Sequence, residues 1–491
     1  MPTMTTTSSL RLDRTMRSVT NYEEWKKLAL EHDAVSGREK WKTVEKSKSY
    51  DHVYIRSLVD NLKELRRQKD DVGLLFALNE GIHGNIGGIG KSTLYERAKF
   101  GTKQLIEAYV DETVSALNHI WKVPESEQLT ASDKLDFFER ASHCFGRSAL
   151  MLSGAGSLGH FHRGVLKTLA EHEMLPNVIS GSSAGSIFAA VVGSYTDDEL
   201  IEILSGDIIK DPMQDKIDRR EKSRMRPQVD ASTLSNTLEA VVPNFTFQEA
   251  YEKTGRCISI TIAPSEEHQN SRLMNAVTSP NVFIRSAVTA SCAVPGVFPP
   301  VMLMAKNVYG EPTPYLPNRR WVDGSVTDDL PAKRLARLYG VNHYIVSQAN
   351  PLALALKAGE NALPLSDLTK SLMRLSTHEI LKSSEKFSRR YLRGVPEVGK
   401  ALSMFYSVIA QDYTGDVNIA PNFDLVDPQK LLGQLTSNEI RELVDAGERA
   451  TWTKLEQIRI CSKIGRTLDH ILDNHDTHNV KRFYKKRVAK K

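Results

Sequence analysis

Residues 149–159 read ALMLSGAGSLG and residues 178–185 read VISGSSAG, and these two stretches decide the fold. Each begins with a short apolar run, which is typical of a buried strand, and then passes into glycines and a helical pattern. Further apolar runs at 258–262 and 344–346 alternate with helical stretches in the same way. The alternation predicts βαβ units, so we expect an α/β fold with a mainly parallel sheet.

The first glycine motif has the G-x-G-x-x-G pattern, from Gly154 to Gly159. A dinucleotide site would also need an acidic residue about 20 residues further on, at the end of the second strand. That strand runs instead into Gly181-Ser182-Ser183-Ala184-Gly185, without a carboxylate. The loop is therefore better suited to presenting backbone N–H groups to a negative charge at a helix N-terminus.

The second glycine motif is G-x-S-x-G, the pattern of a nucleophile elbow. Gly181 and Gly185 flank Ser183 because the turn from strand to helix is too tight for Cβ atoms at these two positions. We predict that Ser183 is a catalytic nucleophile. The backbone N–H groups of Gly154, Ala155 and Gly156 would then stabilise the oxyanion that forms when it attacks.

A nucleophilic serine needs a base, and Asp323 is the leading candidate. It ends the short apolar run Trp321-Val322-Asp323, and Gly324 after it permits a sharp turn. We expect Asp323 to lie with Ser183 at the carboxyl edge of a parallel sheet, where open α/β sheets bind ligands. A histidine base remains the alternative. His343 comes just before an apolar run and so belongs to the opposite edge, whereas His160 and His162 lie nearer the first glycine motif.

Composition narrows the class of protein. The chain has 491 residues, of which 40% are apolar and 25% charged, and this excludes disorder over most of its length. The net charge of +5 does not indicate nucleic-acid binding. Four scattered cysteines, without a CxxC pair, predict neither a disulfide scaffold nor a metal site, so we expect an intracellular protein without a metal or other cofactor. The longest uncharged run, 286–305, contains three prolines and is not expected to span a membrane.

The regions on either side of the α/β domain have a helical pattern. We expect a disordered N-terminus over 1–20, a helical N-terminal domain over 21–144, a helical region over 351–479 and a basic tail over 480–491. An amphipathic helix is predicted over 104–120, and the next helix should begin near Thr130 or Ser132. The sequence Gly90-Lys91-Ser92-Thr93 ends like a P-loop, but the first glycine of that motif is replaced by Asn85, so we expect a glycine-rich turn between helices.

Together, the strand with G-x-G-x-x-G, the G-x-S-x-G elbow and the Asp-Gly-small motif resemble patatin-like phospholipases. The similarity is greatest to the patatin-like triacylglycerol lipases of lipid droplets and covers roughly residues 20–470. Besides the two glycine motifs and Asp323-Gly324, it rests on the stretches 22–25 (YEEW), 81–87 (GIHGNIG), 287–296 (AVTASCAVPG), 347–351 (SQANP) and 447–452 (GERATW). The resemblance implies a three-layer α/β/α domain of patatin type over residues 145–350. It also implies a Ser183–Asp323 dyad, with Gly154 to Gly156 as the oxyanion hole.

Three positions depart from the family pattern. Ala155 replaces a glycine, Leu158 stands where many patatins have a basic residue, and Ser325 replaces a Gly or Ala. Alanine keeps its N–H, so the oxyanion hole is retained if the position does not need a positive φ. Without the basic residue, one partner for a phosphate head group is lost.

The resemblance implies a serine acyl-ester hydrolase of lipids, and triacylglycerol hydrolysis is the activity we expect. The alternatives are a phospholipase A or lysophospholipid acyl hydrolase, and a non-catalytic scaffold at a lipid surface. Expected partners are an acylglycerol or phospholipid substrate and, peripherally, a membrane or lipid-droplet surface. Two basic clusters, at 219–226 and 481–491, are expected to be solvated, as most charge runs are. In the tail, aromatic and apolar residues lie among the cations, so attachment to an anionic membrane surface is the alternative to solvation, with nucleic acid a weaker one. The uncharged stretch 293–305 could line the acyl site or belong to the core. The sequence does not indicate an oligomeric state.

Overall fold

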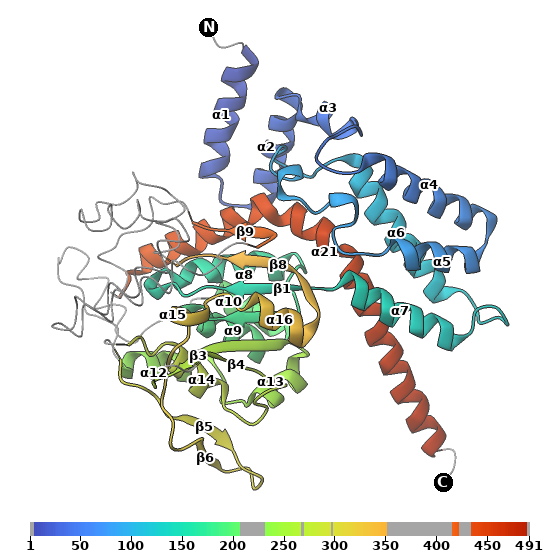
Figure 1. Cartoon of the computed structure of the whole chain (residues 1–491). Helices are drawn as coiled ribbons and strands as arrows, with labels where there is room; N and C mark the ends of the chain where they lie inside the picture. The colour runs from blue at the N-terminus through green and yellow to red at the C-terminus, as the bar shows by residue number, and fades with distance from the viewer. Residues whose placement is uncertain are drawn as a thin grey trace, which may run out of the picture. The chain divides into compact units, whose positions relative to one another are not determined.

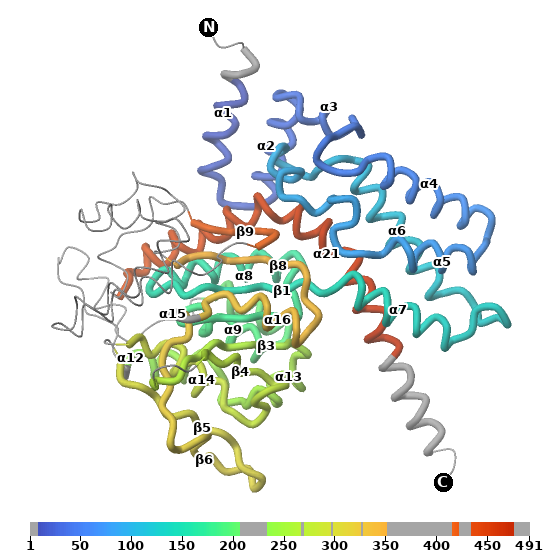
Figure 2. The backbone as a smooth tube through the Cα atoms, in the orientation of Figure 1, coloured from blue at the N-terminus to red at the C-terminus, as the bar shows by residue number. Residues whose placement is uncertain are grey.

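The computed structural model describes residues 4–206, 231–266, 270–295, 298–350, 415–421 and 434–488. These residues form two compact units. The first contains residues 1–148, 335–345 and 452–491, and the second contains residues 149–334 and 346–451. Figure 1 and Figure 2 show the helices and strands of both units. No helix in these ranges is both long enough and apolar enough to cross a bilayer.

The first unit is helical. It contains α1 (Met4–Ser18), α2 (Tyr22–Val35), α3 (Arg38–Thr43), α4 (His52–Gln68), α5 (Asp71–Gly81), α6 (Gln104–Lys122), α7 (Ala131–Phe145) and most of the long helix α21 (Ser437–Val488). The predicted amphipathic helix is α6, and α7 begins at the predicted cap Thr130, whose side chain accepts from the backbone N–H of Asp133.

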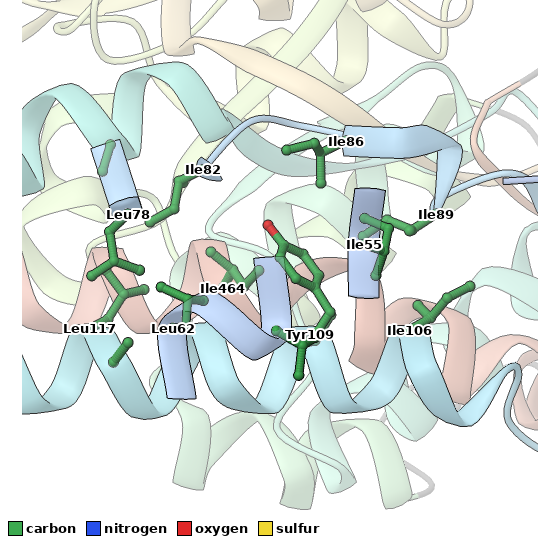
Figure 3. Close-up of a cluster of buried hydrophobic side chains, with 14 of the residues drawn as sticks. Ile55, Leu62, Leu78, Ile82, Ile86, Ile89, Ile106, Tyr109, Leu117 and Ile464 are labelled. Atoms are coloured by element: carbon green, nitrogen blue, oxygen red, sulfur yellow. The ribbon is translucent and has the colours of Figure 1, made fainter. Parts of the chain in front are cut away.

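The core of this unit gathers side chains from helices far apart in the sequence (Figure 3). Tyr109 of α6 and Ile55 of α4 are fully or almost fully buried there, and α21 adds Ile460, Ile464, Leu468 and Ile471. The spacing of three to four residues places these four side chains on one face of α21. Most of α21, which begins in the region expected to be helical, thus belongs to the first unit.

Two expectations for the flanking regions are wrong. Residues 4–18 form a helix rather than a disordered terminus, and Met16 and Val19 are buried against Trp25, Ala29 and Trp452. Burial of these apolar side chains gives the segment a reason to be ordered. In the region expected to be helical, Val417–Ile419 forms a strand, β9, which joins the main sheet. Residues 351–414 and 422–433 lie outside the described residues, as does the basic cluster at 219–226.

The glycine-rich segment after α5 is a turn between helices, as predicted. It contains two single-turn 3₁₀ helices, Ile86–Gly88 and Ser92–Leu94, ahead of α6. Asn85 has a φ of 53° and accepts a hydrogen bond from the backbone N–H of Gly90 at 2.7 Å. The side chain of Asn85 therefore closes the turn at the position where a P-loop would need glycine.

Most of the predicted α/β sheet belongs to the second unit, although residues 341–345 of β8 are assigned to the first; the strand order is β4-β3-β2-β1-β8-β9. The strands are β1 (Arg147–Leu152), β2 (Val178–Gly181), β3 (Cys257–Pro264), β4 (Arg272–Met274), β8 (Val341–Ser347) and β9. The pairs β1–β2 and β2–β3 are parallel, whereas β4 is antiparallel to β3. A further strand, β7 (Trp321–Asp323), also pairs with β3, and it too is antiparallel.

Both faces of this sheet are covered. Burial is continuous along the central strands: it covers all of β2, residues 149–152 of β1 and residues 258–264 of β3. Because successive strand residues point to opposite faces, neither face of the sheet is open to solvent there. The helices of this unit are η3 (Gly156–Gly159, a 3₁₀ turn), α8 (His160–Glu171), α9 (Ala184–Ser194), α10 (Asp197–Ser205), α12 (Ala231–Val241), α13 (Phe247–Thr254), α14 (Ile284–Ser291), α15 (Ser325–Asp328) and α16 (Ala332–Tyr339), which the first unit shares. Continuous burial on both faces is what a three-layer domain requires.

One face of α8 packs into the core, since Phe161, Val165 and Leu169 are fully buried. Where α8 meets the start of α21, the two backbones approach closely. An added Cβ at Gly164 would lie 2.0 Å from the carbonyl oxygen of Val444, and one at Gly447 would lie 2.2 Å from that of Phe161. This close approach gives the glycine of the Gly447–Trp452 motif a physical role.

Candidate active site

Ser183 lies in the sharp turn between β2 and α9. Its φ of 49° and ψ of −126° are strained for a residue with a side chain. An added Cβ would lie 2.4 Å from the carbonyl oxygen of Gly185 if placed at Gly181, and 2.4 Å from that of Leu152 if placed at Gly185. The expectation that Cβ atoms do not fit at these two positions is therefore confirmed.

A second serine, which the sequence analysis did not single out, fixes the backbone of the elbow. The N–H of Ser183 donates to Oγ of Ser291 at 2.9 Å, and Ser291 donates its hydroxyl hydrogen to the carbonyl oxygen of Thr261 at 2.7 Å. Ser291 is fully buried at the end of α14. It thus links the candidate nucleophile to β3. The signal was its place in the quoted stretch 287–296, but a serine there has no distinctive pattern of its own.

Asp323 reaches Ser183 by a different route from the one predicted. It does not end a parallel strand, because β7 runs antiparallel to β3. The register nevertheless brings the two residues level: Ile262 of β3 pairs with Asp323, while Ile260 pairs with Gly181, two residues before Ser183. The register thus sets the two residues at one level of the sheet, whereas the expected strand direction is wrong.

Asp323 is 2% exposed, and its carboxyl group lies close to the Ser183 side chain. Burial raises the pKa of Asp323 to about 6, although hydrogen bonds from the Ser325 backbone N–H, at 2.8 Å, and from Ser183 oppose the shift. The N–H of Asp323 in turn donates to the carbonyl oxygen of Ala293 at 2.9 Å. A carboxyl group with this pKa can hold a proton briefly and release it near neutral pH.

Gly324, immediately after Asp323, also sits against backbone. An added Cβ there would lie 2.6 Å from the carbonyl carbon of Thr261, so no side chain fits between β7 and β3. Gly159 at the end of the first glycine motif is less constrained, because its added Cβ would meet only side chains, those of Ala184 at 3.0 Å and Phe188 at 3.3 Å.

The glycine loop requires one correction. The backbone N–H of Gly154 donates to Oδ1 of Asp329 at 2.7 Å, so Gly154 anchors the loop and its N–H does not point toward a substrate. Ala155 has a φ of −145°, which any residue can adopt, and Gly156 has a φ of +55°. Within the described part of the chain, the N–H groups of Ala155 and Gly156 donate no hydrogen bond to another residue. These two groups are the remaining candidates for an oxyanion hole.

Asp329 is a site residue that the sequence analysis missed. It is 1% exposed; its Oδ2 accepts from the side-chain amide of Asn350 at 3.1 Å, and its carbonyl oxygen accepts from the Ser182 hydroxyl at 3.0 Å. Burial raises its pKa to about 8. In the sequence it is the second of two consecutive acids before a leucine and a proline, which looks like an ordinary end of a helix.

The histidines occupy structural positions. Nδ1 of His343 lies 2.9 Å from Oγ of Ser148, near the start of β1 and away from the edge where Ser183 lies. His162 is fully buried: Nε2 donates to the carbonyl oxygen of Ser153 at 3.0 Å, which leaves Nδ1 to accept from the Ser347 hydroxyl at 2.7 Å. Burial lowers the pKa of both His160 and His162 to about 4, so both are neutral near pH 7.

The uncharged stretch 293–305 is divided in the structure. Ala293 and Leu303 are buried, whereas Pro299 and Pro300 are exposed; residues 296–297 lie outside the described residues. The stretch ends in β5 (Leu303–Lys306), which forms a separate two-stranded sheet with β6 (Pro312–Tyr315). The side chains of the basic tail also lie outside the described part of the chain.

Comparison with known proteins places these features in a family. Residues 150–336 match the family described as patatin-like phospholipase, and residues 3–143 match a domain of unknown function, DUF3336. The chain is 33% identical to the triacylglycerol lipase SDP1L of Arabidopsis thaliana, over 92% of this chain and 57% of that protein. It is also 33% identical to triacylglycerol lipase 4 of Saccharomyces cerevisiae, over 89% of this chain and 50% of that protein. This chain thus spans about half the length of these two relatives.

A third relative, the triacylglycerol lipase ptl2 of Schizosaccharomyces pombe, is 32% identical over 91% of this chain and 73% of its own length. Among solved structures, VipD from Legionella pneumophila aligns over 68% of each chain, with 14% identity and a TM-score of 0.32. Because the identity to ptl2 extends over most of both chains, the chain described here belongs to the patatin-like phospholipase family.

Proposed function

We propose that this chain hydrolyses carboxylic ester bonds of lipids through an acyl intermediate on Ser183. The observation that carries the proposal is the buried carboxyl group of Asp323, which lies close enough to the Ser183 side chain for that side chain to oppose the rise in its pKa. A serine in a strained elbow, beside a carboxylate whose pKa is raised to about 6, has the nucleophile and the base that ester hydrolysis needs.

The proposed reaction has two halves. Asp323 takes the proton of the Ser183 hydroxyl as Oγ attacks the ester carbonyl carbon, and the oxyanion that forms accepts hydrogen bonds from the N–H groups of Ala155 and Gly156. Asp323 then gives the proton to the departing alcohol oxygen, which leaves an acyl-Ser183. In the second half, Asp323 takes a proton from water, the hydroxide attacks the acyl carbon, and Ser183 regains its proton as the fatty acid leaves.

Triacylglycerol is the substrate class we propose. Three relatives that align with most of this chain are named triacylglycerol lipases. In addition, Leu158 is 4% exposed at the position where many patatins carry a cation, so the loop offers no charge to a phosphate head group. Phospholipase A activity is the second candidate, favoured by the family that residues 150–336 match.

A substrate panel tests both candidates. Purified protein is assayed on emulsified triacylglycerol and on phosphatidylcholine at matched interfacial area, and Ser183 is probed with a fluorophosphonate that labels activated serines. We expect faster release of fatty acid from triacylglycerol, and labelling that is lost in Ser183→Ala. Ser194→Ala is the matched control. Ser194 is a buried serine at the far end of α9, and its hydroxyl donates to the carbonyl oxygen of Ala190.

Two outcomes would overturn the proposal. Faster cleavage of phosphatidylcholine would replace triacylglycerol by phospholipid as the substrate class. Absence of both labelling and hydrolysis, in protein whose fold is intact by circular dichroism, would favour the scaffold alternative instead.

A further inference from the structure

The hairpin formed by β5 and β6 exposes two large side chains at its turn. Val308 is 91% exposed and Tyr309 is 84% exposed, the two highest values for a large hydrophobic residue among the described residues. Figure 1 shows that this hairpin extends away from the main sheet of its unit. Covering these two side chains would be favourable, because it would remove their apolar surface from water.

The turn that carries these side chains is ordered. The backbone N–H of Asn307 donates to the carbonyl oxygen of Glu311 at 2.9 Å, and its side-chain oxygen accepts from the N–H groups of Tyr309 and Glu311, both at 2.9 Å. Gly310 supplies the left-handed conformation that the turn needs, with a φ of +86°. These bonds fix the backbone of the turn that presents Val308 and Tyr309 to solvent.

The base of the hairpin is tied to the elements that carry the candidate site. Val301, just before β5, exchanges two backbone hydrogen bonds of 2.8 Å with Trp321, which lies two residues before Asp323. The N–H of Phe283, the residue that caps α14, donates to the carbonyl oxygen of Met304 at 3.0 Å. The hairpin is therefore fixed to the strand that carries Asp323 and to the helix that carries Ser291.

We propose that the turn of residues 307–311 inserts into the surface of a lipid phase and holds the second unit, which carries Ser183 and Asp323, at that surface. The inference rests on the proposed function, since an insoluble ester must be reached at an interface. A valine can enter the acyl region, while a tyrosine has an apolar ring and a polar hydroxyl and suits the head-group level. Arg319 and Arg320 follow the hairpin, against the single acid Glu311 in its turn, so an anionic lipid surface is favoured.

The test measures binding and activity separately. Full-length protein is floated with phosphatidylcholine vesicles containing about 20% phosphatidylserine, at low and at high salt. The lipid concentration is set near the value at which half of the wild-type protein is bound. We expect Val308→Asp with Tyr309→Asp to weaken binding by at least about tenfold at both salt concentrations, because inserted apolar side chains are not screened by salt. Val53→Asp is the matched control, since Val53 is 68% exposed on α4 and should bind as wild type does.

Hydrolysis of a soluble short-chain ester is the second measurement. The hairpin variant should keep its wild-type rate on this ester and lose activity only on emulsified lipid. If wild type does not cleave the soluble ester, the proposed function fails, while the flotation result still decides whether the hairpin binds lipid.

Three results would overturn the inference. One is flotation of the hairpin variant equal to that of wild type. Another is an equal loss of binding in Val53→Asp, which would show that any added acid repels the vesicles. The third is a change in the sedimentation of the hairpin variant without a change in its flotation, which would assign the turn to contact between two copies of the chain.

Discussion

Oδ1 of Asp329 accepts a hydrogen bond from the backbone N–H of Gly154 at 2.7 Å, across 175 residues of sequence. The same residue accepts from Ser182 through its carbonyl oxygen and from Asn350 through Oδ2. One buried residue therefore joins the glycine loop to the turn that carries Ser183. The distance between the candidate nucleophile and the N–H groups of Ala155 and Gly156 depends on this connection.

Replacing Asp329 should impair the chemical step more than substrate binding. In Asp329→Ala the N–H of Gly154 loses its acceptor and the loop is free to shift, so we expect kcat on a soluble ester to fall by about 10²-fold with a smaller change in KM. Steady-state kinetics measures both. Asp328→Ala is the control. Asp328 is the neighbouring acid, but its carboxylate forms a partly exposed ion pair with Arg334, so its loss should affect the rate little. Equal losses in the two variants would contradict a positioning role for Asp329.

Ser183 and Asp323 should behave as one catalytic unit. Ser183→Ala and Asp323→Asn are each expected to remove nearly all ester hydrolysis, and the double variant should be little worse than either single one. Initial rates of the three variants on one ester give the answer. Rates that multiply in the double variant would mean that the two residues act independently.

Activity should decline on the acid side near pH 6. The pKa of Asp323 is raised from 3.8 to about 6 by burial, and a base must be ionised in the free enzyme. Below about pH 6 the carboxyl group is protonated and cannot take the serine proton, so kcat/KM should fall about tenfold for each further pH unit. A profile of kcat/KM between pH 4.5 and 8 measures this. A rate that stays constant down to pH 4.5 would rule out Asp323 as the base.

The same burial predicts a gain in stability when the charge is removed. Because the folded state raises the pKa of Asp323, its ionisation destabilises the fold progressively as the pH rises from about 4 to about 6, by up to about 3 kcal/mol. Asp323→Asn should therefore have a higher unfolding temperature than wild type at pH 8, and the difference should shrink toward pH 4. Thermal unfolding followed by circular dichroism tests it; a lower unfolding temperature at pH 8 would show that the hydrogen bonds of Asp323 outweigh its desolvation.

The sequence was sufficient for those parts of the site that depend on local chain geometry. Gly181, Ser183 and Gly185 could be assigned because a tight turn leaves room only for glycine on either side of the serine, and this constraint acts within five residues. The strands β1, β2 and β3 could also be predicted, because both faces of each strand are buried and each therefore has a short, mainly apolar run.

Features that depend on long-range pairing could not be predicted. The direction of β7 is set by its register with β3, about 60 residues away, and nothing within Trp321-Val322-Asp323 encodes it. Asp329 was missed because its partners Gly154 and Asn350 are distant in sequence, and Gly154 was assigned as an oxyanion donor for the same reason. The sequence analysis did not single out Val308 and Tyr309, because valine and tyrosine are common in buried strands and their exposure depends on how the hairpin packs.

His343 should be dispensable for catalysis. It is the third residue of β8, and its Nδ1 lies 2.9 Å from Oγ of Ser148, whereas Leu152, four residues further along β1, pairs with Gly181. At about 3.3 Å per residue, His343 is therefore set back by roughly 13 Å along the strands from the level of Gly181, beyond the reach of a proton transfer to Ser183. We expect His343→Ala to keep most of the wild-type kcat/KM on a soluble ester, with a small loss of stability from the missing contact to Ser148. A fall of several orders of magnitude in kcat/KM, with the fold intact, would restore a histidine base and refute the Ser183–Asp323 dyad.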